Sequence, residues 1–289
     1  MKKDTIIIGH GFVGRAVEKV LLQSKLNIGI VDPKYFSTLE DFKELNPKFI
    51  FVCIPTPAKR DGMPDYNILK SVINESIKVF PNAIQIVKST ILPNALDFVS
   101  NRDERIVFNP EFLTEKNALK DLINADFQIF GGDLGNCKEA EKFYKDFSLC
   151  KFKRSHFVSI EVASLIKFSI NSFLALKVIF FNQIKEIFTS LDLSDDHYDQ
   201  YIKGIALDKR IGDSHMSVPG HDGRFGFGGA CFPKDTEALL SFFEENKKSF
   251  SLLAEAIKIN NDLRSDYNNL LDREREQNIS FKSKKRIND

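Results

Sequence analysis

The sequence has no tryptophan and no excess of charge of either sign. Its 41 Lys and Arg residues nearly balance 40 Asp and Glu residues, which leaves a formal net charge of +1. This balance provides no electrostatic reason to bind nucleic acid or a membrane surface. An anionic ligand must therefore be held by a local site. Aromatic packing depends on the 27 phenylalanines.

Cysteine is also sparse. The four residues present, Cys53, Cys137, Cys150 and Cys231, lie far apart and form no CxxC pair. This spacing argues against a zinc site or a disulfide framework and is typical of a reducing compartment, so we expect no metal. The N-terminus, MKKDTIII, reaches Gly9 before an apolar segment of signal-peptide length develops.

A long uninterrupted apolar run is missing as well. The most apolar stretch, FLALKVIFF, contains Lys177 and lies between Lys167 and Lys185. We expect it to be too short and too charged to cross a bilayer, which requires about 20 apolar residues. Together these absences predict a cytoplasmic protein with neither a nucleic-acid nor a membrane partner.

Strands and helices alternate through the first half of the sequence. Short β-branched or apolar runs are separated by segments of helical periodicity, which predicts an α/β fold with a parallel sheet built from βαβ units. The length of 289 residues suggests about two domains. The apolar runs cover residues 5–8, 27–32, 48–54, 83–90, 105–111 and 126–132.

The second half has a different pattern. Residues 159–191 have the pattern of one long helix without Gly or Pro, with Ser159 as a candidate N-cap. Apolar residues cover most of its faces, so we expect it to form the core of a second domain or a subunit interface. The last residues are highly charged, and we expect them to fray into solvent. The predicted organisation is a Rossmann-like domain over 1–155, a mostly helical middle domain over 156–270 and a charged tail over 271–289.

The first strand-to-helix turn carries the sequence GHGFVG. Its glycines would let backbone approach a pyrophosphate at the helix N-terminus, where free N–H groups favour an anion. Asp32 ends the next strand, where a carboxylate accepts hydrogen bonds from ribose hydroxyls and repels a 2′-phosphate. The pattern predicts NAD rather than NADP, and the alternative is a Gly-rich turn of another α/β protein. The residues of this turn with an expected cofactor contact are Gly9, Gly11, Phe12, Val13 and Gly14.

Three further loops, IPTPAKRDGMPD, VKSTILPNA and NPEFLTEKNAL, each follow a strand. In an open α/β sheet, the loops beyond the carboxyl ends of the strands line the binding crevice. The polar candidates in these loops are Thr56, Thr90, Glu111 and Glu115. Any one of them alone would more often be a turn residue or a solvated carboxylate.

Two residues of the long helix, Lys167 and Asn171, are four positions apart and share a face. A cation beside an amide donor could stabilise an oxyanion or alkoxide. A Lys with its ammonium group in solvent and an Asn on a polar edge would produce the same pattern, so the alternative stays open here.

The stretch GFGGACFPKD places Cys231 after three glycines and before Lys234 and Asp235. One interpretation is a tight turn with a buried, inert cysteine, since most free cysteines are buried. The other is a nucleophile displayed on a loop, with Lys234 and Asp235 beside it to tune charge and move protons.

Taken in order, these motifs resemble the UDP-glucose/GDP-mannose dehydrogenase family. The matching stretches are GHGFVG, IPTP…DGMPD, KST, NPEFL, IKFSINSFLALKVIFFNQI and RIG…FGFGGACFPKDT, from residue 6 to about residue 240. The resemblance implies an NAD-binding Rossmann domain and a long helix with a helical domain that forms a homodimer. It also implies a further C-terminal nucleotide-binding domain, which we expect this chain to lack.

The resemblance implies a reaction and roles for individual residues. The C6 primary alcohol of a nucleotide sugar, with UDP-glucose as the best match, is oxidised to a carboxylate with two NAD. Cys231 would capture the aldehyde as a thiohemiacetal and then carry a thioester. Lys167 and Asn171 would stabilise the developing negative oxygen, and Asp235 would take part in proton transfer through water.

The resemblance also implies supporting contacts. Glu115 would assist thioester hydrolysis, with Thr90 positioning the water, and the glycines of residues 226–229 would let the substrate lie against backbone. The implied cofactor contacts beyond the first turn are Asp32, Pro55, Thr56 and Thr90. The implied substrate contacts are Glu111, Phe112, Leu113, Lys167, Asn171, Arg210, Phe225, Gly226, Gly228 and Lys234.

Three functions are compatible with these observations. The first is a compact NAD-dependent nucleotide-sugar 6-dehydrogenase, which the joint presence of Lys167, Asn171, Cys231 and Asp235 favours. The second is a weakly active or inactive dinucleotide-binding protein that pairs with a full-length enzyme. The third is a dehydrogenase of a smaller hydroxylated substrate.

Overall fold

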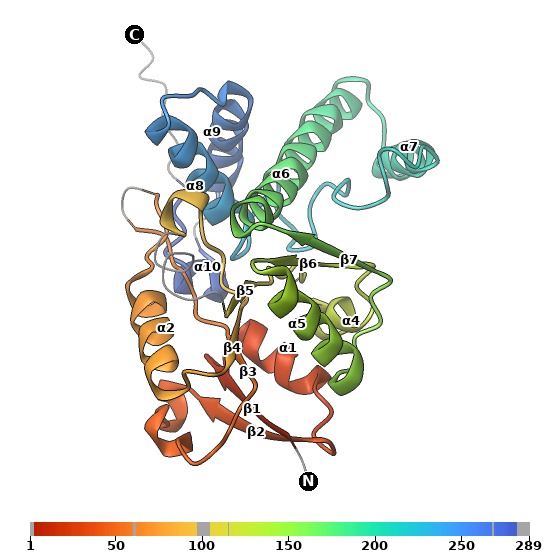
Figure 1. Cartoon of the computed structure of the whole chain (residues 1–289). Helices are drawn as coiled ribbons and strands as arrows, with labels where there is room; N and C mark the ends of the chain where they lie inside the picture. Colours follow the sequence, from red (N-terminus) through yellow and green to blue (C-terminus); the bar gives the residue numbers. More distant parts are fainter. Residues whose placement is uncertain (1–2, 60–61, 97–104, 115, 268, 282–289) are drawn as a thin grey trace. The chain divides into compact units, whose positions relative to one another are not determined.

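The chain divides into two compact units. A computed structural model describes residues 3–59, 62–96, 105–114, 116–267 and 269–281. The N-terminal unit consists of Met1–Thr56 and Pro64–Lys167, and the C-terminal unit of Pro57–Met63 and Phe168–Asp289 (Figure 1). The short segment 57–63 therefore packs with the later part of the chain, although both of its sequence neighbours belong to the N-terminal unit.

The N-terminal unit is built on a seven-stranded sheet. The strands are β1 (Lys3–Ile8), β2 (Leu26–Val31), β3 (Phe49–Val52), β4 (Ile84–Val87), β5 (Ile106–Phe108), β6 (Phe127–Gly131) and β7 (Arg154–Val158). Their order in the sheet is β2-β1-β3-β4-β5-β6-β7. All pairings from β2 across to β5 are parallel. The chain therefore crosses over from β2 to the far side of β1 before the sheet grows in one direction.

Side chains of the central strands alternate between two hydrophobic clusters. Ile6 and Ile8 of β1 belong to one cluster with Ile50 of β3, whereas Ile7 belongs to the other with Phe51. This period of two places one cluster on each face of the sheet. All five side chains are at most 2% exposed, which is the burial expected of strands covered on both faces.

Helices cover both faces of this sheet (Figure 1). The first cluster includes the buried side of α2 (Asn67–Val79), and the second includes those of α1 (Phe12–Val20) and α5 (Leu134–Phe147). α4 (Ala118–Ile123) packs against α1. Three short 3₁₀ helices lie in connections: η1 (Pro33–Tyr35) and η2 (Glu40–Phe42) between β2 and β3, and η3 (Pro93–Ala95) after β4.

The expectation of a wholly parallel sheet is wrong in one place. β6 runs antiparallel to β5, with Phe108 opposite Gly131, and β7 runs parallel to β6. The sequence pattern did not indicate β7, because its residues RSHFV are polar or half-exposed and form no apolar run. The sheet is mostly parallel, and the prediction of an α/β Rossmann-like fold followed by a long helix is confirmed.

The long helix α6 (Ile160–Ser190) begins and ends within one residue of the predicted range. Ser159 lies just before it, and its Oγ accepts a hydrogen bond from Val162 N at 3.4 Å. By length and composition α6 could cross a membrane, with a mean hydropathy of 1.6 over its most apolar window, 44% of which is buried in the protein. The expectation of a segment too short and too charged concerned the stretch FLALKVIFF alone, whereas it is the whole of α6 that has this length and composition. The core helix of a globular protein passes the same test.

The described part of the C-terminal unit is helical apart from its loops. Besides most of α6 it contains α7 (Asp195–Ala206), α8 (Phe232–Glu245), α9 (Ser251–Ser265) and α10 (Asp272–Glu276). The last helix corrects, as far as residue 281, the expectation that the charged end of the chain frays into solvent, and residues 282–289 lie outside the described residues. Glu274 is fully buried and Ile279 nearly so. The buried Glu274 carboxylate is tolerated because it accepts hydrogen bonds from two backbone N–H groups of this unit.

Candidate active site

In the glycine turn between β1 and α1, Gly11 borders open space, whereas Gly9 and Gly14 are packed closely against neighbouring backbone. Gly9 has φ +85°, and a Cβ there would stand 2.7 Å from the Cys53 carbonyl oxygen. A Cβ on Gly14 would stand 1.9 Å from the Gly9 carbonyl oxygen, so this glycine lets α1 pack against the turn. A Cβ on Gly11 would meet nothing within 4 Å. The backbone at the start of α1 is thus accessible to a pyrophosphate, as the fingerprint requires.

Asp32 follows β2 and is held beside this turn. Its Oδ2 accepts a hydrogen bond from His10 N at 2.6 Å, and its Oδ1 accepts one from Lys34 N at 2.9 Å. Both bonds orient the carboxylate and leave lone pairs on each oxygen for further donors. This arrangement fits the ribose of NAD, and the carboxylate would repel the 2′-phosphate of NADP.

His10 is a member of this site that the sequence reasoning missed. Its ring is buried between two side chains, with Nδ1 2.8 Å from the Tyr35 hydroxyl and Nε2 2.9 Å from Glu18 Oε2. His10 therefore links the glycine turn to α1 and to the residues after Asp32. Its place inside GHGFVG was the available signal, but the turn pattern leaves this position open to any residue.

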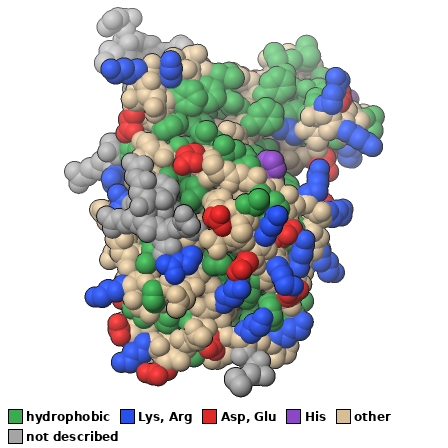
Figure 2. Space-filling model, in the orientation of Figure 1, with side chains coloured by type: hydrophobic (Ala, Val, Ile, Leu, Met, Phe, Trp, Pro, Cys, Tyr) green, Lys and Arg blue, Asp and Glu red, His purple; other side chains and the backbone are tan. Residues whose placement is uncertain are grey.

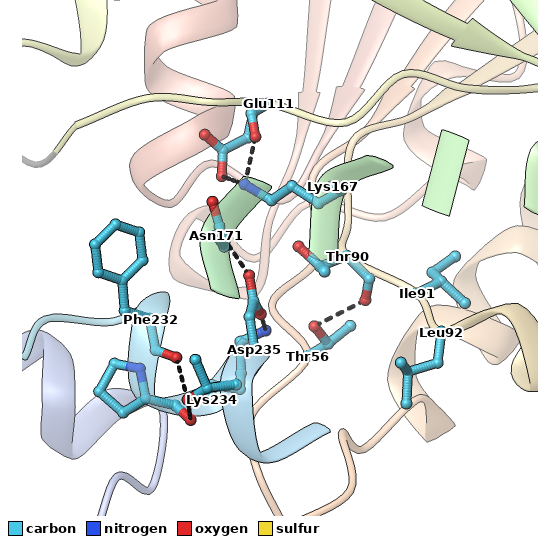
Figure 3. A network of polar contacts seen from close by, with 12 residues as sticks. Thr56, Thr90, Ile91, Leu92, Glu111, Lys167, Asn171, Phe232, Lys234 and Asp235 are labelled. Carbon is cyan, nitrogen blue, oxygen red and sulfur yellow. Dashed lines mark hydrogen bonds and ion pairs between the residues drawn. The ribbon is translucent and has the colours of Figure 1, made fainter. Parts of the chain in front are cut away.

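The expected site residues in the loops after β3, β4 and β5 differ in their burial and in their hydrogen bonds. Pro55 is exposed and Thr56 is buried. The Thr56 hydroxyl donates a hydrogen bond to the Thr90 carbonyl oxygen at 3.2 Å, so these two loops are joined (Figure 3). Glu111 Oε2 accepts a hydrogen bond from Leu113 N at 2.6 Å. Glu115, expected to assist hydrolysis, lies outside the described residues.

Lys167 is buried, which removes the alternative of an ammonium group in solvent. It is 2% exposed. Its Nζ donates to the Glu111 carbonyl oxygen at 2.5 Å and lies 3.6 Å from Glu111 Oε1 (Figure 3). The ammonium also lies 5.1 Å from the centre of the Phe112 ring. A buried cation is tolerated because a carboxylate, a carbonyl and an aromatic face surround it.

Asn171 and Asp235 form the second polar pair, within the C-terminal unit. Asn171 Nδ2 donates a hydrogen bond to Asp235 Oδ2 at 2.6 Å, and Lys234 Nζ lies 2.6 Å from Asp235 Oδ1 (Figure 3). All three side chains are buried. A carboxylate bonded at both oxygens is fixed in orientation, which is what a group that moves protons requires.

Cys231 differs from the other three cysteines. Burial raises the pKa of Cys53 and of Cys137 to about 12 and also raises the pKa of Cys150, which keeps these thiols protonated. Cys231 is half-buried and caps the N-terminus of α8, where its carbonyl oxygen accepts the Asp235 N–H at 2.8 Å. A negative charge is favoured at such a helix end. The role of Cys231 as a displayed nucleophile stays a prediction.

One helix carries members of both polar pairs. Lys167 and Asn171 are separated by four residues of α6, so their side chains project from the same helical face one turn apart. Asp235 in turn lies one turn into α8 from Cys231. Lys167 is the last residue of the N-terminal unit, whereas the Asn171–Asp235 pair and Cys231 lie together within the C-terminal unit.

The glycines before Cys231 have a structural reason that the sequence did not indicate. Gly226 has φ +71°, and a Cβ there would stand 2.5 Å from Asn260 Oδ1. A Cβ on Gly228 would stand 2.6 Å from both Arg264 Nη1 and Glu274 Oε1. The space beside these two glycines is filled by side chains of the same unit. Approach of a substrate to this backbone stays a prediction.

Two expected substrate contacts lie at the surface. The Arg210 guanidinium pairs with the Asp208 carboxylate through Nε and Nη2. Phe225 is exposed, and its backbone N–H donates to the Tyr267 hydroxyl at 3.0 Å. Among the described residues, no group of three His, Cys, Asp or Glu side chains is arranged to hold a metal ion.

Lys88, of the KST stretch, is buried, and its ammonium group makes hydrogen bonds inside the N-terminal unit. Its Nζ donates to the Asn109 carbonyl oxygen at 3.0 Å and to Asn109 Oδ1 at 2.9 Å, beside the Tyr144 hydroxyl. Burial lowers the pKa of Lys88 below its ordinary value. These contacts join β4, β5 and α5 inside the sheet unit.

Two regions of the chain match sequence profiles of a known family. Residues 34–148 match the NAD binding domain of the UDP-glucose/GDP-mannose dehydrogenase family, and residues 161–262 match its central domain. The UDP-glucose 6-dehydrogenase of Rickettsia conorii is 32% identical over 244 residues, which is 78% of this chain and 51% of that protein. The corresponding protein of Rickettsia bellii is 30% identical over 225 residues, or 74% of this chain and 49% of that one. The chain spans about half the length of the curated relatives it matches.

Solved structures share the fold. A UDP-glucose dehydrogenase from Pyrobaculum islandicum superposes with a TM-score of 0.72 at 22% identity, covering 90% of this chain and 68% of that chain. A 3-hydroxyisobutyrate dehydrogenase from Mycobacterium tuberculosis superposes with a TM-score of 0.68 at 17% identity, covering 93% of this chain and 96% of that chain. At these identities the likeness shows the fold alone.

Proposed function

Because the chain belongs to the UDP-glucose/GDP-mannose dehydrogenase family and contains its NAD-binding domain, we propose that it is an NAD-dependent nucleotide-sugar 6-dehydrogenase. Its substrate is proposed to be UDP-glucose, which is oxidised at C6 to UDP-glucuronate. The names of the matching relatives support this substrate. The geometry of the glycine turn and of Asp32 supports NAD as the cofactor.

The first oxidation converts the C6 alcohol to an aldehyde. Bound NAD would supply the hydride acceptor, one NAD molecule for this oxidation and a second NAD molecule for the next. The Lys167 ammonium and the Asn171 amide stabilise negative charge on the substrate oxygen as its proton leaves. Asp235 accepts that proton through a water molecule, since its carboxylate is held ready by Asn171 and Lys234.

The second oxidation proceeds on Cys231. The Cys231 thiol adds to the aldehyde carbon: a C–S bond forms, the C=O π bond opens, and the proton lost from sulfur is taken up by the carbonyl oxygen, which becomes the hydroxyl of a thiohemiacetal. Loss of hydride from carbon and of the hydroxyl proton converts this species to a thioester. Water then adds to the thioester carbonyl, the C–S bond breaks, and the carboxylate and the free thiol result. Glu115 and Thr90 are proposed to assist this hydrolysis.

The observation that carries the proposal is the Asn171–Asp235 hydrogen bond next to Cys231. In a chain without catalysis, a buried carboxylate would need only to be neutralised, and Lys234 alone accomplishes that. The Asn171 amide donates to the opposite oxygen of Asp235, which lies one helical turn from Cys231, and this supports a built site for the substrate oxygen.

The working unit is proposed to be a cytoplasmic homodimer formed through α6. Exposed apolar side chains lie at helical spacing along this helix, and Figure 2 shows hydrophobic surface over it. They include Phe173, Phe180 and Ile187. Burial of such a stripe against a second copy would remove it from water. Size-exclusion chromatography with light scattering should give twice the mass of the chain, and a monomer would contradict this part of the proposal.

The decisive experiment is to follow NADH absorbance after mixing the protein with NAD and UDP-glucose, and then with other nucleotide sugars. Two NADH per substrate consumed are expected. Cys231→Ser should lose the second oxidation, whereas Cys150→Ser, which alters a thiol of raised pKa, should behave as the unchanged protein.

The other outcomes separate the alternatives. Absence of NADH from every sugar, with NAD still bound in calorimetry, would favour a non-catalytic dinucleotide-binding protein. NADH formation from small hydroxy acids that free UDP does not inhibit would favour a dehydrogenase of a smaller substrate.

A further inference from the structure

The loop that leads into Cys231 is held almost entirely by side chains. Residues 225–229 form no helix or strand, and five of their backbone groups bond to side chains from other segments. The partners are Asn182 of α6 for Gly226 N, Asn260 and Arg264 of α9 for Phe227 N and Gly226 O, Tyr267 for Phe225 N, and Glu274 of α10 for Gly229 N.

Glu274 makes the contact nearest to Cys231. Its Oε1 accepts the Gly229 N–H at 2.9 Å, and its Oε2 accepts the Leu271 N–H at 2.8 Å. The side chain is fully buried. One carboxylate therefore joins the loop, two residues before Cys231, to the first turn of α10. A charge-assisted bond of this kind is stronger than a neutral one.

The segment that contains Glu274 is itself fixed in place. Ile279 N donates to the Glu274 carbonyl oxygen at 2.9 Å, which folds the chain back after α10. The Gln277 carbonyl accepts the Ala58 N–H at 3.1 Å, and Asn278 Nδ2 donates to the Ala58 carbonyl oxygen at 3.1 Å. α10 is thus anchored to segment 57–63 within the same unit, so it can act as a support for the loop.

The loop needs such a support because its own backbone is permissive. Gly226 and Gly229 have φ of +71° and +79°, conformations that glycine leaves easily because it has no Cβ. The hydrogen bond from Gly229 N–H to Glu274 restricts this glycine to one conformation, which matters because a misplaced nucleophile loses rate steeply.

We propose that Glu274 is a positioning residue for Cys231: it fixes Gly229 and thereby the position of the thiol at the start of α8. This inference rests on the proposed function for its catalytic consequence. Its structural content, a loop ordered by Glu274, can be tested whether or not the chain oxidises a sugar.

The test compares Glu274→Ala with Glu276→Ala, which removes an exposed carboxylate from the same short helix. In Glu274→Ala, hydrogen exchange of the peptide covering residues 225–231 should accelerate by about tenfold, the loss expected for one buried hydrogen bond. In the same variant, the rate at which iodoacetamide alkylates Cys231 should also differ from that of the unchanged protein. Glu276→Ala should match the unchanged protein in both measurements, and NAD affinity in calorimetry should be the same in all three.

A second variant, Glu274→Gln, tests the proposal if Glu274→Ala fails to fold. Glu274→Gln keeps size and shape but can accept only one of the two N–H bonds, so exchange in residues 225–231 should still accelerate. Unchanged exchange and alkylation in Glu274→Gln would overturn the proposal. Faster exchange of all peptides together would also overturn it, because it would assign Glu274 a general stabilising role.

Activity adds a further readout if the unchanged chain forms NADH. Glu274→Gln should then lower kcat by about tenfold and leave the KM for NAD unchanged, because the cofactor turn belongs to the other unit. If the unchanged chain forms no NADH, the proposed function fails, while exchange and alkylation still decide the role of Glu274.

Discussion

The two units hold their functional segments by different means. In the N-terminal unit, the cofactor turn joins a strand to a helix, and its glycines are required by neighbouring backbone, the carbonyls of Cys53 and Gly9. In the C-terminal unit, the loop before Cys231 belongs to no regular element, and its glycines are required by side chains such as Asn260 and Glu274. The first site depends on the regular geometry of a sheet, and the second on buried polar groups brought from distant segments.

The largest expected effect tests whether the polar groups of the C-terminal unit are catalytic or only structural. Asp235→Asn keeps size and shape but removes the carboxylate proposed to accept a proton. NADH formation should fall by about 10²–10⁴-fold, as for loss of a general base. Asp272→Asn, at an exposed position in the same unit, should leave the rate unchanged. Equal rates in the two variants would leave the Asn171–Asp235 pair without a catalytic role.

The next prediction tests how far the buried apolar side chains of the N-terminal unit stabilise it. Phe51 is fully buried beside Phe143 and Tyr144, so Phe51→Ala should lower the free energy of unfolding by about 3–5 kcal/mol. Phe36→Ala provides the matched control, since Phe36 is 94% exposed. Urea unfolding measures both. A loss below 1 kcal/mol for Phe51 would show that the sheet core tolerates the cavity, contrary to its close packing.

A smaller effect is expected from loss of one side-chain hydrogen bond to the loop backbone in the C-terminal unit. Asn260→Ala leaves the buried Phe227 N–H without its acceptor at 2.6 Å, which should cost about 1–3 kcal/mol of unfolding free energy. Asn261→Ala, next to it on α9 and more exposed, should cost less. Hydrogen exchange of residues 225–231 should accelerate in the first variant alone. Identical behaviour of the two variants would contradict the description of this loop.

The smallest effect concerns a polar group inside the apolar unit. The pKa of Lys88 is lowered from 10.5 by burial, so between its lowered pKa and 10.5 the unfolded chain binds more protons than the folded one. The contribution of Lys88 to the free energy of unfolding should therefore rise with pH through this window and level off above it. Lys88→Met should flatten that rise, whereas Lys48→Met, at an exposed site, should not. Urea unfolding at neutral pH and near pH 10.5 measures the slope.

Sequence patterns predicted the features that depend on local periodicity. The glycine turn, the central strands and α6 follow from the spacing of apolar and small residues, and the structure confirms them. Lys167 and Asn171 were correctly placed on one helical face, because the period of an α-helix fixes that relation. His10 and Glu274 were missed, since neither repeats in a periodic pattern and each acquires its role from partners far along the chain.

The sequence by itself determined an α/β chain with an NAD-type turn, a long central helix and a cysteine that follows a run of glycines. Only the tertiary structure decided that β6 runs antiparallel to β5, that segment 57–63 packs with the C-terminal unit, and that the charged residues Asp272–Glu276 form α10. The physical reason is the separation along the chain over which each interaction acts. Periodicity and turn chemistry act over a few residues, whereas the partner of a buried polar group can lie anywhere in the chain, as Glu274 lies 45 residues from Gly229.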